Sequence, residues 1–221
     1  QLKMPAEDGK FRETDCANTK NMFRIIQSIP SPKAESFKQC LAQVGYERIQ
    51  EIENPELAQD RAKEYYELKG YPKDWIDKRL RGIAIRQELT DEWKQRDVTQ
   101  EKDFAILTNE ISKATFGKTV EEYKQFKGVL KPNQNLRDHM NDWELILNMI
   151  GEKATTDITI AKDAKGFLEL RHTAKEGDIA KNTRKELEQK IGKSIVSDGN
   201  FLHLSEKKKK KLIEDKKINL S

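Results

Sequence analysis

Apolar side chains recur at three- and four-residue intervals along most of the chain, and this spacing constrains the fold more than any other feature. Phe37, Leu41 and Val44, for example, occupy positions i, i+4 and i+7 of one helix face. The chain also carries 36% charged residues and only 11 glycines in 221 residues, a composition that favours helices over sheets. We therefore predict a mainly α fold, a multi-helix bundle.

The N-terminal residues follow a different pattern. Asp8-Gly9 lies between two short extended runs, which is a β-hairpin signal. A lone hairpin is marginal in water, so we expect it to belong to a sheet whose other strands lie elsewhere. The first residue is Gln1 rather than Met, and we expect the chain to begin inside a longer protein or after a cut.

Capping and breaking residues divide the remainder into helices. Ser31 before Pro32 is an N-cap with proline at the first helical position. Thr119 with Glu122, and Asn141 with Glu144, form capping-box patterns. We expect helices to begin at Thr19, Pro32, Pro55, Pro72, near Thr99, at Thr119 and at Asn141, and one long helix to cover 164–191 and end at Gly192.

Three finer expectations concern particular side chains. Thr90 is expected to cap a short turn that contains Trp93, and residues 195–196 to form a short extended piece. Cys16 and Cys40 do not make a disulfide framework, and Cys40 is expected to act as a small buried hydrophobe. The helix after Asn141 is expected to bury a face of four apolar side chains, Trp143, Ile146, Leu147 and Ile150.

The domain organisation is predicted from composition. Residues 96–100 lack core-facing periodicity, which places a boundary there between a helical connector region (53–98) and a helical C-terminal domain (99–204). Residues 1–52 form a separate N-terminal region, and 205–221 a Lys-rich flexible tail. Residues 206–217 hold seven Lys and three acids, a net +4 that equals the charge of the whole chain. Residues 1–205 therefore sum to zero, unlike many DNA-binding domains.

Catalytic and metal-binding patterns are missing from the sequence. The candidate ligands Cys16, Cys40, His139, His172 and His203 lie at none of the usual metal spacings. No nucleophile turn, Walker A sequence or dinucleotide-binding glycine pattern occurs, and two Glu-x-Lys triplets read as solvated helix faces. No apolar run is long enough to span a membrane and no signal peptide is present. We expect a cytoplasmic, non-enzymatic protein without cofactor.

A basic, turn-rich stretch offers the best candidate for a binding surface. Residues 113–137 carry a local net charge of +4, with Tyr123 and Phe126 among the lysines. Such a connector between two helices can place lysines and backbone amides on phosphates. The alternative is that the lysines only keep a surface connector soluble, with the two aromatic residues in the core. The candidate nucleic-acid-binding residues are Lys113, Lys118, Lys124, Lys127, Lys131, Asn133 and Arg137. The run Lys207–Lys211 could bind any polyanion, or be a solvated tail.

Several short segments of the chain resemble segments of known families, and they occur in the same order as in those families. Residues 2–10, 27–35, 41–45 and 89–94 resemble the closing part of the Bro-N domain of phage-related bacterial proteins. Residues 103–107, 127–128 and 135–140 resemble the C-terminal region of DNA-damage-inducible protein D, and the likeness extends through 155–156, Gly177, Ala180, Arg184, Glu188 and 192–193. Asp178 and Thr183 depart from the residues common in that family.

The resemblance implies a function and an origin for the hairpin. Bro-N domains are regarded as DNA-binding modules of phage antirepressors, so the hairpin would be the remnant of an α+β Bro-N domain that starts before Gln1. DNA-damage-inducible protein D is regarded as an SOS-regulated modulator of RecA filaments. The expected function is a non-enzymatic DNA-binding regulator of the antirepressor type, or alternatively a protein-interaction module acting on RecA or a phage repressor. Homo-oligomers are compatible with either function.

Overall fold

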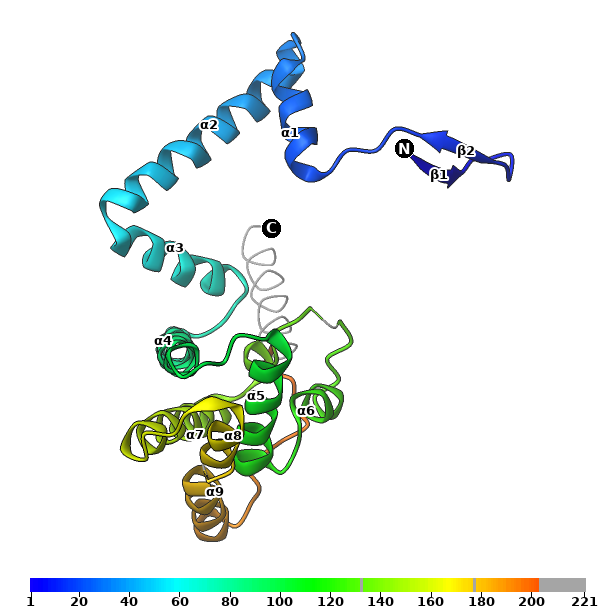
Figure 1. The fold of residues 1–221 in the computed structure, drawn as a ribbon. Helices are drawn as coiled ribbons and strands as arrows, with labels where there is room; N and C mark the ends of the chain where they lie inside the picture. The colour runs from blue at the N-terminus through cyan, green and yellow to red at the C-terminus, as the bar shows by residue number, and fades with distance from the viewer. Residues whose placement is uncertain (132, 177, 203–221) are drawn as a thin grey trace, which may run out of the picture. The chain divides into compact units, whose positions relative to one another are not determined.

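The computed structural model describes residues 1–131, 133–176 and 178–202. Its elements follow the chain in the order shown in Figure 1, and the fold is mainly helical with one small antiparallel hairpin at the N-terminus. The elements are β1 (Leu2–Pro5), β2 (Phe11–Thr14), α1 (Thr19–Ser28), α2 (Pro32–Glu53), α3 (Pro55–Leu68), α4 (Lys73–Gln95), α5 (Glu101–Phe116), α6 (Val120–Phe126), the 3-10 helix η1 (Leu136–His139), α7 (Asp142–Ala161), α8 (Gly166–Lys175) and α9 (Asp178–Ile191). The Lys-rich tail (205–221), Gly177 and His203 lie outside the described residues.

The chain divides into two compact units, Gln1–Arg61 and Ala62–Ser221. In the first unit, β1 and β2 pair antiparallel with Leu2 opposite Thr14, and both strands are exposed along their length. Helix α1 packs on α2, where the rings of Phe23 and Phe37 lie 5.7 Å apart. Near the end of α2, Glu51 is buried and accepts hydrogen bonds from Arg48 of the same helix and from Arg61 of α3.

Several predicted helix ends are confirmed. The Ser31 side chain accepts from the backbone N–H of Lys33, with Pro32 in the first turn. Both predicted capping boxes are complete, at Thr119–Glu122 and at Asn141–Glu144. Local side-chain chemistry determines these ends, which is why the sequence predicts them well.

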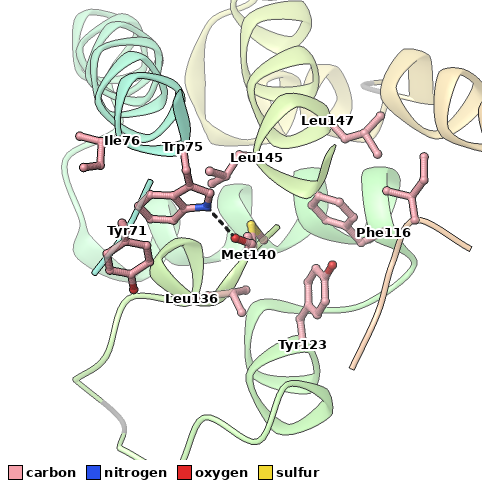
Figure 2. Close-up of a cluster of buried hydrophobic side chains, with 10 residues drawn as sticks. Tyr71, Trp75, Ile76, Phe116, Tyr123, Leu136, Met140, Leu145 and Leu147 are labelled. Atoms are coloured by element: carbon pink, nitrogen blue, oxygen red, sulfur yellow. Dashed lines mark hydrogen bonds between the residues drawn. The ribbon is translucent and has the colours of Figure 1, made fainter. Parts of the chain in front are cut away.

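The core of the second unit has two clusters of buried side chains. The first joins α4, α5, α6, η1 and α7 and contains Tyr71, Trp75, Ile76, Phe116, Tyr123, Leu136, Met140, Leu145, Leu147 and Ile195. Figure 2 shows the indole of Trp75 beside Tyr71, and its Nε1 donates to the carbonyl of Met140 at 3.0 Å. The second cluster joins α4, α5 and α8 and contains Leu89, Trp93, Val98, Leu107, Ile111, Ala164, Leu170 and Ala174.

The boundary predicted near 96–100 falls inside the second unit. Val98 is buried in the second cluster, and the Arg96 side chain donates to the carbonyl of Ala164. This segment connects α4 to α5 within one core. Its lack of periodicity reflects a turn that is packed rather than a linker.

Four local predictions are wrong. Thr90 lies inside the continuous helix α4 and donates its hydroxyl to the carbonyl of Arg86, which satisfies it without a cap. The helix expected over 164–191 is two helices, because α8 ends at Lys175 and Asp178 begins α9 with an acid in its first turn. Residues 195–196 form no strand, and Cys40, like Cys16, is an exposed free thiol.

The prediction of which α7 side chains are buried is also wrong in part. Leu147 is fully buried, but Trp143 is 46% exposed. Helix α7 packs against α4, α5, α8 and α9, so contacts surround more than one of its faces. Its buried positions are Glu144, Leu145, Leu147, Asn148, Gly151, Glu152, Thr155, Thr156 and Thr159.

Candidate functional site

The predicted basic residues lie on the segment that runs from the end of α5 through α6 to η1. Helix α5 ends at Phe116 and is capped by Gly117, whose φ of 74° is the left-handed conformation that glycine adopts most readily. The Thr119 capping box then starts α6, and the Asn135 side chain caps η1 by accepting from the backbone N–H of Arg137. These turns bring the lysines of two helices to one region with the connector.

Lys127 does not belong to an exposed surface. Lys127 is only 2% exposed. Its ammonium group lies 2.8 Å from Oε2 of Glu144, which is also buried. The ammonium also donates to the carbonyls of Ser197 and Gly199, each at 3.0 Å. The prediction that Lys127 contacts nucleic acid is therefore wrong, because a buried and paired ammonium cannot reach a phosphate.

Lys127 is instead the centre of a buried polar network that attaches residues 197–200 to the helices. Glu144 accepts from the hydroxyl of Tyr123 at 2.7 Å as well as from Lys127. Burial, and then the charge of Glu144, raise the pKa of Tyr123 far above its ordinary value. Asn200 completes the attachment, since its amide donates to the Lys127 carbonyl. We call this set, Tyr123, Lys127, Glu144, Ser197, Gly199 and Asn200, the Lys127 network.

The remaining predicted lysines stay accessible. Lys113 and Lys131 are exposed, and Lys118 and Lys124 are half-buried. The ammonium of Lys118 lies 4.7 Å from the centre of the Phe126 ring, a cation–π distance. Tyr123 is in the core as the alternative interpretation supposed, whereas Phe126 remains 39% exposed.

Three of the predicted residues line one cavity of about 330 Å³: Lys124, Asn133 and Arg137. The cavity is bounded by α5, α6, the connector and α7, and we call it the polar cavity. Its other lining residues are Thr108, Ile111, Ser112, Val120, Gln134, Asn135, Leu136, Met140, Asn148 and Glu152. Lys113, Lys118 and Lys131 are not among them. The structure therefore groups part of the predicted site around a recess that the sequence did not predict.

Two residues that line the polar cavity, Arg137 and Glu152, belong to a compact charged cluster that also includes Arg86. Glu152 is 1% exposed and its Oε1 accepts from the guanidinium of Arg137. The Arg86 guanidinium lies 3.5 Å from the same oxygen and donates to the hydroxyl of Thr108. Burial lowers the pKa of Arg86, with the charge of Arg137 acting in the same direction and Glu152 opposing both. Two cations therefore share one buried carboxylate.

The sequence reasoning missed Glu152 and Asn148. The available signal was a polar stripe at helical spacing, since Glu144, Asn148 and Glu152 lie four residues apart along α7. The apolar residues of the same helix form a competing pattern, and that pattern predicts a different buried face. The structure buries the stripe and leaves part of the apolar face open.

The open apolar face of α7 forms part of a second recess, an open groove of about 550 Å³. We call it the apolar groove. It lies between α4, α7 and α9 and is lined by Ile85, Ile146, Met149, Ile150, Lys153, Ala154, Asp157, Ile158 and Ile179. Lys153 and Asp157 at its edge pair with one another at 3.1 Å.

Two hydroxyl groups that line the polar cavity are bonded to backbone carbonyls. The hydroxyl of Ser112 donates to the Lys118 carbonyl, and that of Thr108 to the Phe104 carbonyl, so both hold the backbone. No group of three His, Cys, Asp or Glu that could hold a metal ion occurs in the described part of the chain. Among the helices of that part, none is long and apolar enough to cross a membrane.

Comparison with known proteins provides no family. No protein-family model matches the chain, and no curated protein matches it significantly. The class that the fold and the site define is a mainly helical protein with a charged polar cavity and an apolar groove on its second unit.

Proposed function

We propose that this chain is a non-enzymatic regulator that binds nucleic acid through the surface around the polar cavity. The observation that supports this proposal is the grouping of Lys124, Asn133 and Arg137 on one recess, next to further exposed lysines on the same segment. Amides and cations together can hold a phosphate backbone and the base edges beside it. The resemblance to Bro-N antirepressors agrees with this proposal. A regulator of this kind would act in the cytoplasm.

The neutral charge of residues 1–205 sets the kind of binding that we expect. A protein with few phosphate contacts binds weakly and with a moderate salt dependence. With contacts from Lys113, Lys118, Lys124 and Lys131, the slope of log affinity against log salt should be about −3.6 for duplex DNA. Binding should be measured by fluorescence anisotropy on duplex and single-stranded DNA from low to physiological salt.

Single lysine variants test the surface itself. Lys113→Gln, Lys118→Gln and Lys131→Gln should each weaken binding of every sequence and each reduce the salt slope by about 1. Lys102→Gln is the matched control, because Lys102 is exposed on the same helix as Lys113 but 11 positions before it. A flat salt response, or equal effects of Lys102→Gln and Lys113→Gln, would exclude this surface.

The apolar groove favours a second candidate, a protein-interaction function on RecA filaments or on a phage repressor. Isoleucines from three helices line the groove, and exposed apolar patches of this kind mark protein-binding sites. Under this proposal, Ile150→Glu should abolish co-elution with RecA–single-stranded DNA filaments while Lys131→Gln leaves it intact. Co-elution that survives Ile150→Glu, or that is absent from the unsubstituted protein, argues against it.

A further inference from the structure

Two side chains that line the polar cavity have hydrogen-bonding atoms without partners. Oε2 of Glu152 and Nε of Arg137 are both buried, and neither has a hydrogen-bond partner in the described part of the chain. An unmet buried polar atom costs on the order of 1–3 kcal/mol, and more when it is charged. A ligand that donates one hydrogen bond to Glu152 Oε2 and accepts another from Arg137 Nε would satisfy both atoms.

The charge of the cluster favours a ligand with a negative group. Arg86 and Arg137 converge on the single carboxylate of Glu152, which leaves an excess of one positive charge in this cluster. A buried excess of positive charge is costly unless an anion balances it. The ligand should therefore carry an anionic group as well as the donor and acceptor.

The other residues that line the cavity indicate the chemical class of the uncharged part of the ligand. Ile111, Val120, Leu136 and Met140 provide apolar contacts, and the amides of Asn133, Gln134 and Asn148 lie among them. A volume of about 330 Å³ is in the range of small-ligand sites. Apolar walls with a few polar groups suit a flat ring whose edge forms hydrogen bonds.

We propose that the polar cavity binds one nucleotide unit, with the base inside and the phosphate beside Lys124. A nucleobase edge that carries an N–H beside an acceptor can satisfy Glu152 Oε2 and Arg137 Nε together. The phosphate supplies the negative charge. This inference rests on the proposed function for the source of the nucleotide, an unstacked unit of a single strand, since a base in a duplex cannot enter a cavity without leaving the stack. A free nucleotide has the same chemistry.

The experiment uses the full chain and two substitutions in the cavity. Glu152→Gln keeps the shape of the side chain and removes its charge, and Asn148→Leu replaces a lining amide with an apolar group of similar size. Glu110→Gln is the matched control, because Glu110 is also a largely buried glutamate paired with an arginine, Arg171, but it does not line the cavity. Thermal unfolding shows which variants fold.

Binding is measured with deoxynucleoside monophosphates, inorganic phosphate, a short single strand and the same sequence as a duplex. We expect the single strand to bind more tightly than the duplex, and Glu152→Gln and Asn148→Leu each to weaken its binding about tenfold or more. Glu110→Gln should change nothing. If Glu152→Gln does not fold, Asn148→Leu provides the result.

The outcomes separate this inference from the proposed function. If the protein binds DNA but both cavity variants bind it as the unsubstituted protein does, the nucleotide site is refuted and the surface remains. If no DNA binds at low salt, the proposed function fails. In that case monophosphate binding that both variants weaken supports the site with a free nucleotide as its ligand, and no such binding, or binding of inorganic phosphate with equal affinity, refutes the site.

Discussion

At the scale of single residues, the second unit differs from a simple apolar core in how many charges it buries. Glu144 and Glu152 are 0% and 1% exposed, and each is paired with a cation from another part of the chain. The two carboxylates have different surroundings. Both oxygens of Glu144 have partners, whereas Oε2 of Glu152 has none among the described residues. The first is therefore a structural anchor and the second a candidate for binding.

Lys127→Met should destabilise the protein severely. Removing one member of a buried ion pair leaves the other charge uncompensated, so the free energy of unfolding should fall by about 3–5 kcal/mol. Lys131→Met is the control, since exposed lysines change stability by less than about 0.5 kcal/mol. Chemical denaturation measures both, and equal midpoints for the two variants would contradict the Lys127 network. Adding Glu144→Leu to Lys127→Met should restore part of the loss.

Tyr123 gives the Lys127 network a pH dependence. Burial raises the pKa of Tyr123 in the folded protein, so this phenol stays protonated at a pH where the unfolded chain loses the proton, above about 10. Stability should then fall as pH rises past 10, by about 1.4 kcal/mol per pH unit from this group. The Tyr123→Phe variant should lose stability less steeply between pH 10 and 11. Parallel curves for the two proteins would show that Tyr123 titrates normally.

At the scale of helices and strands, the sequence predicts most where the determining contacts are local. The hairpin at Asp8-Gly9, the Ser31–Pro32 start and both capping boxes depend on residues within a few positions of one another, and all are confirmed. The buried face of α7 depends on four other helices, and the local pattern could not identify it. Lys124 and Arg137 were identifiable as parts of a basic connector, whereas the cavity between them and Glu152 forms only when α5 and α7 pack together.

Gly151 lies where α7 packs tightly against α5. A Cβ at this position would lie 2.6 Å from the hydroxyl oxygen of Thr115, which is too close. Gly151→Ala should therefore destabilise the protein by about 1–3 kcal/mol despite the better helix propensity of alanine. Gly82→Ala in α4 is the matched control, because its nearest contact is an ordinary 3.5 Å to Met149, and it should be neutral or stabilise by up to about 1 kcal/mol.

A double substitution identifies the contact responsible. Thr115→Ala removes the opposing hydroxyl, so Gly151→Ala should cost less in that background, with a coupling of about 0.5–3 kcal/mol. Thermal or chemical unfolding of the four proteins gives this coupling. Additive effects would mean that α5 and α7 are further apart than the structure places them.

At the scale of the whole molecule, the two units differ in how much they bury. In the first, β1, β2 and α1 contain no buried residue, and several large apolar side chains are exposed, among them Leu2, Phe11, Ile25 and Ile52. The second contains both buried clusters. Since burial of apolar surface is the main stabilising contribution, stability should be concentrated in the second unit.

Hydrogen exchange should show this difference directly. The opening free energies of amides in α7 should approach that of global unfolding, about 5–15 kcal/mol for a protein domain. In β1, β2 and α1 they should lie below about 2 kcal/mol, because no buried side chain holds those elements. Mass spectrometry of exchanged peptides measures both regions in one sample. Comparable protection in α1 and α7 would indicate that the exposed apolar side chains are covered in solution.

The stacking of Arg86 on Trp93 has an optical consequence. The guanidinium carbon of Arg86 lies 5.2 Å from the ring centre of Trp93, which is fully buried. The same guanidinium group approaches Glu152, which lines the polar cavity. Indole emission responds to nearby charge, so any molecule that displaces or neutralises Arg86 should change the colour or intensity of Trp93 fluorescence. Trp143, being 46% exposed, can be quenched selectively by a solute. The emission of Trp93 then adds to that of Trp75, which is also fully buried, and a change in their sum on binding reports occupancy of the cavity without a label.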